Sequence, residues 1–129
     1  MSPRRPVDGG GRVFRSRAEG LVRQARRAGR VVIGVRQTVE AVRDRRLTAA
    51  LLASDLSGPR REALLERLRK AGVPVYEGWT KDGLGELAGR VAVAALGITD
   101  RHIADGLIRL ADEATGSGGI GNEEVDQSG

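Results

Sequence analysis

The sequence contains no cysteine and very few aromatic residues. Without cysteine, a chain forms neither a disulfide framework nor a thiolate metal site, and the expected compartment is the reducing cytoplasm. Phenylalanine, tyrosine and tryptophan occur once each, at Phe14, Tyr76 and Trp79. Proteins that hold single-stranded nucleic acid nonspecifically stack its bases on aromatic rings, and three scattered rings do not build such a platform.

Long apolar runs and catalytic groupings are also absent from the sequence. No apolar segment approaches the roughly 20 residues that span a bilayer, and the N-terminus lacks the apolar centre of a signal peptide. His102 is the only histidine, so it has no second histidine or cysteine with which to bind zinc or activate a nucleophile. Asp55 lies in the turn-forming segment SDLSGP, where capping explains it better than catalysis. We therefore expect no enzyme activity, no metal, no other cofactor and no membrane association.

Arginine is abundant and is concentrated at one end of the chain. Residues 1–46 hold 13 arginines and four acidic residues, whereas residues 47–129 hold nine basic and 13 acidic residues. The two parts therefore carry net charges of +9 and −4, which sum to the +5 of the whole chain. A basic region predicts a polyanionic partner. The alternative is a solvated surface in an arginine-rich lineage, and the charge balance alone does not separate the two.

The spacing of apolar residues predicts an α/β protein. Strands that alternate with helices indicate a three-layer α/β/α sandwich with a mixed sheet of about four strands. Flanking segments 1–15 and 114–129 are rich in glycine and charge and are predicted to be disordered tails, which leaves one domain at 16–113. Strands are predicted at 31–33, 49–53, 73–76 and 91–96, and helices at 16–28, 35–45, 59–71, 80–89 and 99–113.

Two glycine-rich segments match parts of nucleotide-binding patterns without the context that those patterns need. Residues 116–121 read G-x-G-x-x-G, but no strand precedes them. Residues 83–89 lack the lysine and hydroxyl residue of a phosphate-binding loop. Neither segment predicts a nucleotide cofactor.

The segment VVIGVRQTVEAVRDRR places a helix start directly after a predicted strand. Gly34 ends the strand, and the free amides of the next helical turn can bind an anion. At helical spacing Arg36 and Gln37 stand beside Glu40, and Arg43 continues the row. Such side chains can hydrogen-bond base edges. The alternative is an amphipathic helix in which Arg36 and Glu40 simply pair, and the residues alone favour neither interpretation.

The same segment resembles a known family. IGVRQTVEAVRDRR is similar to the bacterial form of a signature of the kink-turn RNA-binding ribosomal proteins, the large-subunit protein seven-Ae type. AALLASDLSGPRREALLERLRKAGVPVY resembles the family's second strand, third helix and third strand. LGELAG resembles its L-G-x-A-x-G motif, and ALGITDRHIA resembles the closing strand and helix of the bacterial ribosome-associated branch. The resemblance runs from about residue 16 to residue 113.

The resemblance implies a cytoplasmic, monomeric protein that binds structured RNA without catalysis, with ribosomal RNA, the ribosome or a kink-turn-like helix–bulge–helix element as its partner. The helix start would read tandem sheared G·A pairs, and a second loop would pack apolar side chains against bulged nucleotides. The RNA-binding residues implied in this way are Gly34, Arg36, Gln37, Thr38, Glu40 and Arg43 at the helix start, and Ala88, Gly89, Arg90, Val91 and Ala92 in the loop.

Two features depart from the family pattern. Glu40 stands where the family usually has a lysine, and the loop after Gly89 is a few residues shorter than in kink-turn binders. Two other functions stay open at this point. One is a protein-interaction module whose basic helix docks an acidic partner, and the other is an RNA-recognition subunit that acts with a separate RNA-modifying enzyme.

Overall fold

A five-stranded mixed sheet lies at the centre of the computed structural model, which describes residues 7–8 and 11–116. The strands are β1 (Val7–Asp8), β2 (Val31–Ile33), β3 (Ala49–Leu52), β4 (Val75–Glu77) and β5 (Ala95–Ile98). The helices are α1 (Arg12–Arg27), α2 (Val35–Arg43), α3 (Pro59–Lys70), α4 (Lys81–Ala88) and α5 (Arg101–Gly116).

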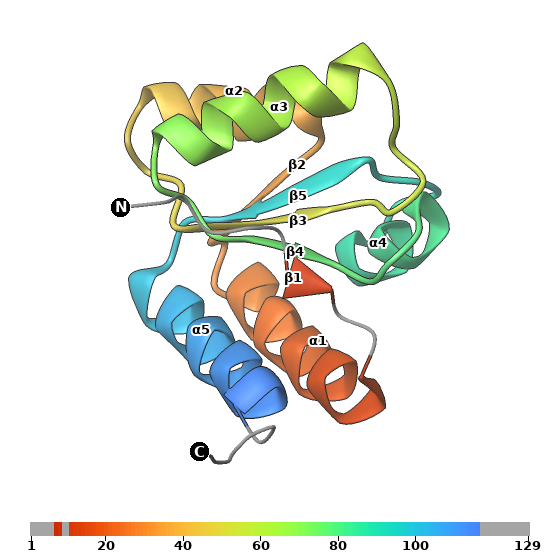
Figure 1. Cartoon of the computed structure of the whole chain (residues 1–129), viewed down its shortest axis with the longest axis vertical. Coiled ribbons are helices and arrows are strands. Elements are labelled where there is room, and N and C mark those ends of the chain that lie inside the picture. Colours follow the sequence, from red (N-terminus) through yellow and green to blue (C-terminus); the bar gives the residue numbers. More distant parts are fainter. Residues whose placement is uncertain (1–6, 9–10, 117–129) are drawn as a thin grey trace.

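The sheet has the strand order β1-β4-β3-β5-β2. Strands β1, β4 and β3 are parallel, while β5 runs antiparallel to both of its neighbours, β3 and β2. Helices α2 and α3 cover one face and α1 and α5 the other, and α4 lies at one end of the sheet (Figure 1). The predicted three-layer sandwich is therefore confirmed, with its four predicted strands and a two-residue strand, β1, added at one edge.

The core lies on both sides of β3, whose residues Ala49–Leu52 are all buried because the strand is central to the sheet. Gly97 on β5 leaves room for the side chains of Leu47, after α2, and Val32 on β2. A Cβ atom there would lie 2.5 Å from Leu47 Cδ1 and 2.7 Å from Val32 Cγ2. A side chain at Gly97 would therefore displace Leu47 or Val32.

The N-terminal domain boundary differs from the prediction. Helix α1 begins at Arg12 rather than Ser16, and Phe14 in its first turn is only 5% exposed. Its ring lies 6.1 Å from that of Tyr76 and 6.5 Å from that of Trp79. Burial of an aromatic ring stabilises this turn, and a sequence scan for tails misses such a contact. The predicted tail 1–15 is therefore wrong for residues 11–15, which belong to the folded domain.

Parts of the predicted tails still lie outside the described residues. Val7 and Asp8 pair with Tyr76 and Glu77 as strand β1, so this piece also departs from the prediction. Helix α5 extends to Gly116, past the predicted end at residue 113. Residues 1–6, 9–10 and 117–129 are not described, and the prediction made for them stays a prediction.

Strand β5 begins at Ala95, four residues later than predicted. The preceding loop is hydrogen-bonded to α4 at two points: Arg90 N donates to Gly85 O at 2.8 Å, and Val93 N donates to Lys81 O at 2.9 Å. Since the Val93 amide is already used by α4, Val93 does not donate to the sheet, and pairing toward β3 begins at Ala94, whose carbonyl accepts from Ala53 N at 2.9 Å.

Capping explains the polar residues near α4, as predicted for Asp55. The Asp55 carboxylate accepts a hydrogen bond from Lys81 N at 2.9 Å, and Thr80 Oγ1 accepts one from Gly83 N at 3.1 Å. Both bonds satisfy amides of the first helical turn.

His102 is exposed in the first turn of α5. Within the described part of the chain, no helix is long and apolar enough to cross a membrane.

Candidate nucleic-acid interface

The junction between β2 and α2 has an open backbone at Gly34. Its amide donates to Ala95 O at 2.8 Å, which extends the pairing of β2 with β5 by one residue. Gly34 has φ +98°, in the region that favours glycine, and a Cβ atom there would meet nothing within 4 Å. Glycine is therefore required by the backbone, and the space above it is open.

The start of α2 has no side-chain cap and no acidic residue in its first turn. Helix amides without such partners attract anions, because the helix dipole also places partial positive charge at this end. Among the described residues, the first amide of α2 that bonds back to Gly34 O is that of Thr38, at 3.0 Å.

Four of the predicted RNA-binding residues of α2 are exposed. The Arg36 side chain is 91% exposed and forms an ion pair with Glu40, with Nε and Oε2 3.6 Å apart. The i, i+4 ion pair expected of a simple amphipathic helix is therefore present, and it lies on the same surface as the candidate site. Arg43 is exposed one turn further along. Gln37 is exposed too, and its Oε1 accepts a hydrogen bond from Ile33 N at 3.1 Å.

Thr38 is placed differently from its neighbours. Its side chain is fully buried, and Thr38 Oγ1 donates to Gly34 O at 2.8 Å. It contributes no surface to an interface, although the family resemblance grouped it with the exposed residues. Its hydroxyl instead holds the Gly34 carbonyl and so supports the turn from β2 into α2.

The second predicted segment, Ala88 to Ala92, is a loop that follows α4. Ala88 is buried at the end of the helix, and Gly89 takes the left-handed conformation that ends it, at φ +72°. Arg90, Val91 and Ala92 are exposed. Val91 stands out at 93% exposure, so an apolar side chain projects from the loop into solvent.

Gly85, which was not among the predicted site residues, lets this loop lie against α4. A Cβ atom at Gly85 would lie 2.6 Å from Val91 O and 2.7 Å from Arg90 O, so any side chain would displace the loop backbone. The residue lies inside the LGELAG motif, and the spacing of that motif carries the only signal for its role.

The loop and the start of α2 lie beside each other in the fold. The bond from Gly34 N to Ala95 O joins the end of β2 to the end of the loop. Figure 1 shows the start of α2 next to the chain that connects α4 with β5. We call this surface the α2 edge: Gly34, Arg36, Gln37, Glu40 and Arg43, together with Gly89, Arg90, Val91 and Ala92.

Arg26 of α1 adds a third element to the α2 edge. Its Nη1 donates to Leu87 O at 3.1 Å, across 61 positions of sequence. A Cβ atom at Gly89 would lie 2.6 Å from Arg26 Nη2, so the guanidinium rests against the loop glycine. Sequence reasoning missed this residue, because nothing in the spacing of α1 indicates a contact with α4.

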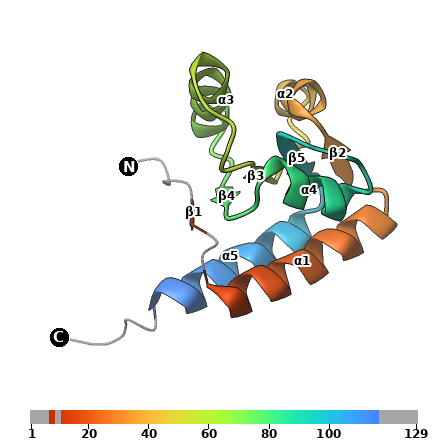
Figure 2. The same ribbon diagram turned by 90° about the vertical axis from the view of Figure 1, so that its right-hand side faces the viewer.

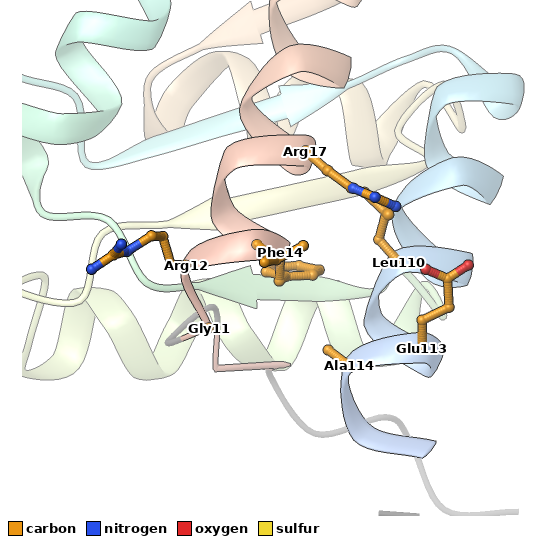
Figure 3. A pocket seen from close by; sticks show the side chains of 8 residues that line it. Gly11, Arg12, Phe14, Arg17, Leu110, Glu113 and Ala114 are labelled. Atoms are coloured by element: carbon orange, nitrogen blue, oxygen red, sulfur yellow. The ribbon is translucent and has the colours of Figure 1, made fainter. Parts of the chain in front are cut away.

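A separate hollow lies between α1 and α5. Its volume is about 320 Å³, and it is mainly apolar, with Phe14, Leu110 and Ala114 in its lining. Figure 3 shows Phe14 on its floor, with Arg17 extending from α1 toward α5. None of the predicted site residues lines this hollow, so it is distinct from the α2 edge.

Solved structures share this fold. A protein of unknown function from Bacillus halodurans is 26% identical, with a TM-score of 0.68 over 74% of this chain and 96% of that one. A 15.5 kD RNA-binding protein from Giardia lamblia is 15% identical, with a TM-score of 0.67 over 81% of this chain and 89% of that one. At 15% identity, the second likeness shows the fold alone.

Comparison of the sequence with protein families gives a match over most of the chain. No curated protein sequence matches significantly. The model of the ribosomal protein L7Ae/L30e/S12e/Gadd45 family matches residues 16–107, which include all of β2, α2, α4 and the loop that follows α4. The chain belongs to the ribosomal protein L7Ae/L30e/S12e/Gadd45 family.

Proposed function

We propose that this protein binds structured RNA at the α2 edge and catalyses no reaction. The observation that carries the proposal is the juxtaposition of an open glycine, an uncapped helix start and exposed hydrogen-bonding side chains beside an exposed apolar loop. Family membership and the RNA-binding protein of similar fold support it. The partner would be ribosomal RNA or a kink-turn-like element in the cytoplasm.

The open space at Gly34 would admit the RNA backbone to the free amides of α2. A phosphate placed there would gain hydrogen bonds and a favourable helix dipole. Any side chain at Gly34 would both strain the backbone and fill that space. This part of the contact would fix the position of the RNA without reading its sequence.

Arg36 and Gln37 would supply the directional contacts. An arginine can bind guanine through two parallel hydrogen bonds, and its pairing with Glu40 here limits where the guanidinium can point. The Gln37 oxygen already accepts from Ile33 N, which orients the side chain, and its amide nitrogen has two hydrogens to donate to a base edge. Gln37 would therefore recognise acceptors, such as a purine N7 or O6.

Val91 would provide the apolar part of the contact. A side chain that is 93% exposed gains by being covered, and a base swung out of a helical stack offers an apolar face of suitable size. In a helix–bulge–helix RNA, paired bases would then lie against α2 while a bulged base lies against the loop. This division of contacts favours a kink-turn-like element over a regular duplex.

The test removes the directional contacts and leaves the fold intact. We expect Arg36→Ala to cost about 1 to 3 kcal/mol of affinity for a synthetic kink-turn RNA, the range for one good base-edge contact. Gln37→Glu should cost a similar amount, because it keeps an oxygen for Ile33 N but removes the amide donor. Thermal unfolding should change little for both, since the two side chains are exposed.

Arg67→Ala on α3 is the matched control, because Arg67 is also exposed and carries the same charge. If Arg67→Ala weakens RNA binding as much as Arg36→Ala does, the basic surface acts as a diffuse field and the α2 edge is not the site. If no structured RNA binds, while a discrete protein complex survives nuclease treatment, the family's RNA-binding role does not extend to this chain.

A further inference from the structure

Helix α1 carries a row of arginines beyond the α2 edge. Arg12, Arg15, Glu19, Arg23 and Arg26 follow one another at intervals of three or four residues, so they lie along one side of the helix. Arg15 is partly exposed, and Arg12, Arg23 and Arg26 are exposed. We call these four arginines the α1 row.

Two contacts show that the α1 row lies on the side of α1 that faces α4. Arg26 donates to Leu87 O at the end of α4, and Glu19 Oε2 accepts from Trp79 Nε1 at 2.8 Å, just before α4 begins. Figure 2 shows α4 above the C-terminal half of α1. In Figure 3, Arg12 and Arg17 leave α1 in opposite directions, and Arg17 extends toward α5. Arg17 therefore does not belong to the row.

The charge of the row is only weakly opposed. Glu19 is the one acidic residue of α1; one of its oxygens accepts from Trp79, and the other lies 3.8 Å from Arg23 Nη2. No carboxylate in the described part of the chain forms a salt bridge with Arg12, Arg15 or Arg26. A surface with several unpaired guanidinium groups at regular spacing suits a polyanion better than it suits a protein partner.

The row is also continuous with the α2 edge. Arg26 touches the loop at Gly89, and Arg12 lies 14 residues earlier, about 21 Å away along the axis of a helix. An RNA held at the α2 edge therefore has a straight line of cations leading away from it. The contacts available there are charge contacts from flexible side chains, which bind phosphates regardless of sequence.

We propose that the α1 row binds the phosphate backbone of a duplex stem of the RNA that the α2 edge holds. The proposal rests on the proposed function, because the stem is defined as the continuation of that RNA. It adds a second contact surface with a separate role: the α2 edge recognises the bulged element, while the α1 row lengthens the contact and strengthens it without adding sequence preference.

The test compares RNAs that differ only in stem length. The probes are a synthetic kink-turn RNA with two short stems and two versions in which one stem or the other is long enough to reach Arg12. For one of the long probes, we expect the double variant Arg12→Gln/Arg23→Gln to lower affinity roughly tenfold and to reduce the salt slope of binding by about two. The affinity of this double variant for the short probe should stay within about twofold of the affinity of the wild-type protein.

Two controls remove charge without touching the row. Arg60→Gln/Arg67→Gln removes the same two charges from α3, and Arg17→Gln removes one from the opposite side of α1. Both should affect the short and long probes equally. If the row variant also weakens all three probes equally, or none of them, the row is no stem contact and the inference is overturned.

Arg36→Ala separates this inference from the proposed function. Loss of binding by Arg36→Ala, with no stem-dependent effect of the row variant, would overturn only the α1 row. Full binding by both Arg36→Ala and Gln37→Glu would overturn the α2 edge itself, and the α1 row with it.

Discussion

Helices α1 and α3 are both rich in basic residues, but the surroundings of their charges differ. Helix α1 holds six arginines and one glutamate, and α3 holds four arginines, one lysine and two glutamates. From composition alone, both would be candidates for a nucleic-acid surface. In the structure they lie on opposite faces of the sheet (Figure 1), and only one of them presents a row of largely unpaired cations.

The charges of α3 are partly used within the protein. Arg61 pairs with Glu77, and its Nη1 also donates to Ala53 O at 3.3 Å and to Leu56 O at 3.2 Å. Glu66 takes two more cations, with Arg69 Nη2 at 2.6 Å and Lys70 Nζ at 3.6 Å. The hydrogen bond from Arg69 holds the pKa of the Glu66 carboxyl below its usual range.

The arginines of α1 have few such partners. Arg26 binds a backbone carbonyl, which leaves its positive charge without a counter-ion, and Arg23 has a weak contact with Glu19. The difference shows that net charge alone does not identify a polyanion-binding surface. Pairing inside the fold decides whether an arginine is available to phosphate, and sequence spacing reports such pairing only within one helix.

The largest expected effect is a loss of stability when Arg61 of α3 is removed. Arg61→Ala should lower the free energy of unfolding by about 2 kcal/mol, because it leaves the partly buried Glu77 carboxylate without its partner and two carbonyls without a donor. Urea denaturation would measure the change. Arg60→Ala is the control, since Arg60 is exposed on the same helix, and it should change stability by no more than about 0.5 kcal/mol. Equal small losses in both variants would mean that the Arg61 contacts contribute nothing.

A smaller effect is expected where α1 meets α4. Arg26→Ala should cost about 1 kcal/mol of stability, because Leu87 O loses its side-chain donor at the end of α4. The same change should weaken RNA binding, since the guanidinium rests against Gly89 in the α2 edge. Arg27→Ala removes the same charge from the next residue and should leave stability almost unchanged. A variant of Arg27 that is as damaging as that of Arg26 would show that charge, and not the contact with α4, matters here.

Most of the fold could be predicted because its signals are local. The apolar spacing of residues 59–71 predicted α3, and the segment SDLSGP predicted a turn, in which the Asp55 carboxylate caps α4. Gly34 could be placed between strand and helix because both periodicities stop at it. These features depend on neighbours in sequence, and local propensities describe them well.

The remaining features depend on contacts between distant residues. Phe14 belongs to the core because it meets Tyr76 and Trp79, and β5 starts late because its loop bonds to α4. In the site, helical spacing placed Arg36, Gln37, Glu40 and Arg43 on the surface, but a resemblance to a family motif cannot distinguish an exposed threonine from a buried one. Thr38 is buried because its hydroxyl reaches back to Gly34 O inside the turn.

The smallest expected effect is a gain in RNA affinity when the charges of α3 lose their partner. Glu66→Gln frees Arg69 and Lys70 from their shared carboxylate, so α3 would come to resemble α1 in its unpaired charge. We expect affinity for a plain RNA duplex at low salt to rise by roughly twofold, with a steeper salt dependence. Thermal unfolding at neutral pH should change little, because the pair is exposed.

Low pH should have the same effect as Glu66→Gln, because protonation also removes the negative charge of the Glu66 carboxylate. The pKa of this carboxyl is lowered in the folded state, so its contribution to stability is present above the unfolded pKa and is lost as the pH falls through the folded pKa. For the substitution experiment, the control is Glu62→Gln, which makes the same change of charge on the same helix, because Glu62 has no salt bridge in the described residues. If Glu66→Gln and Glu62→Gln raise the affinity for the RNA duplex equally, net charge alone is responsible. A rise confined to Glu66→Gln would mean that pairing is what keeps the cations of α3 from RNA.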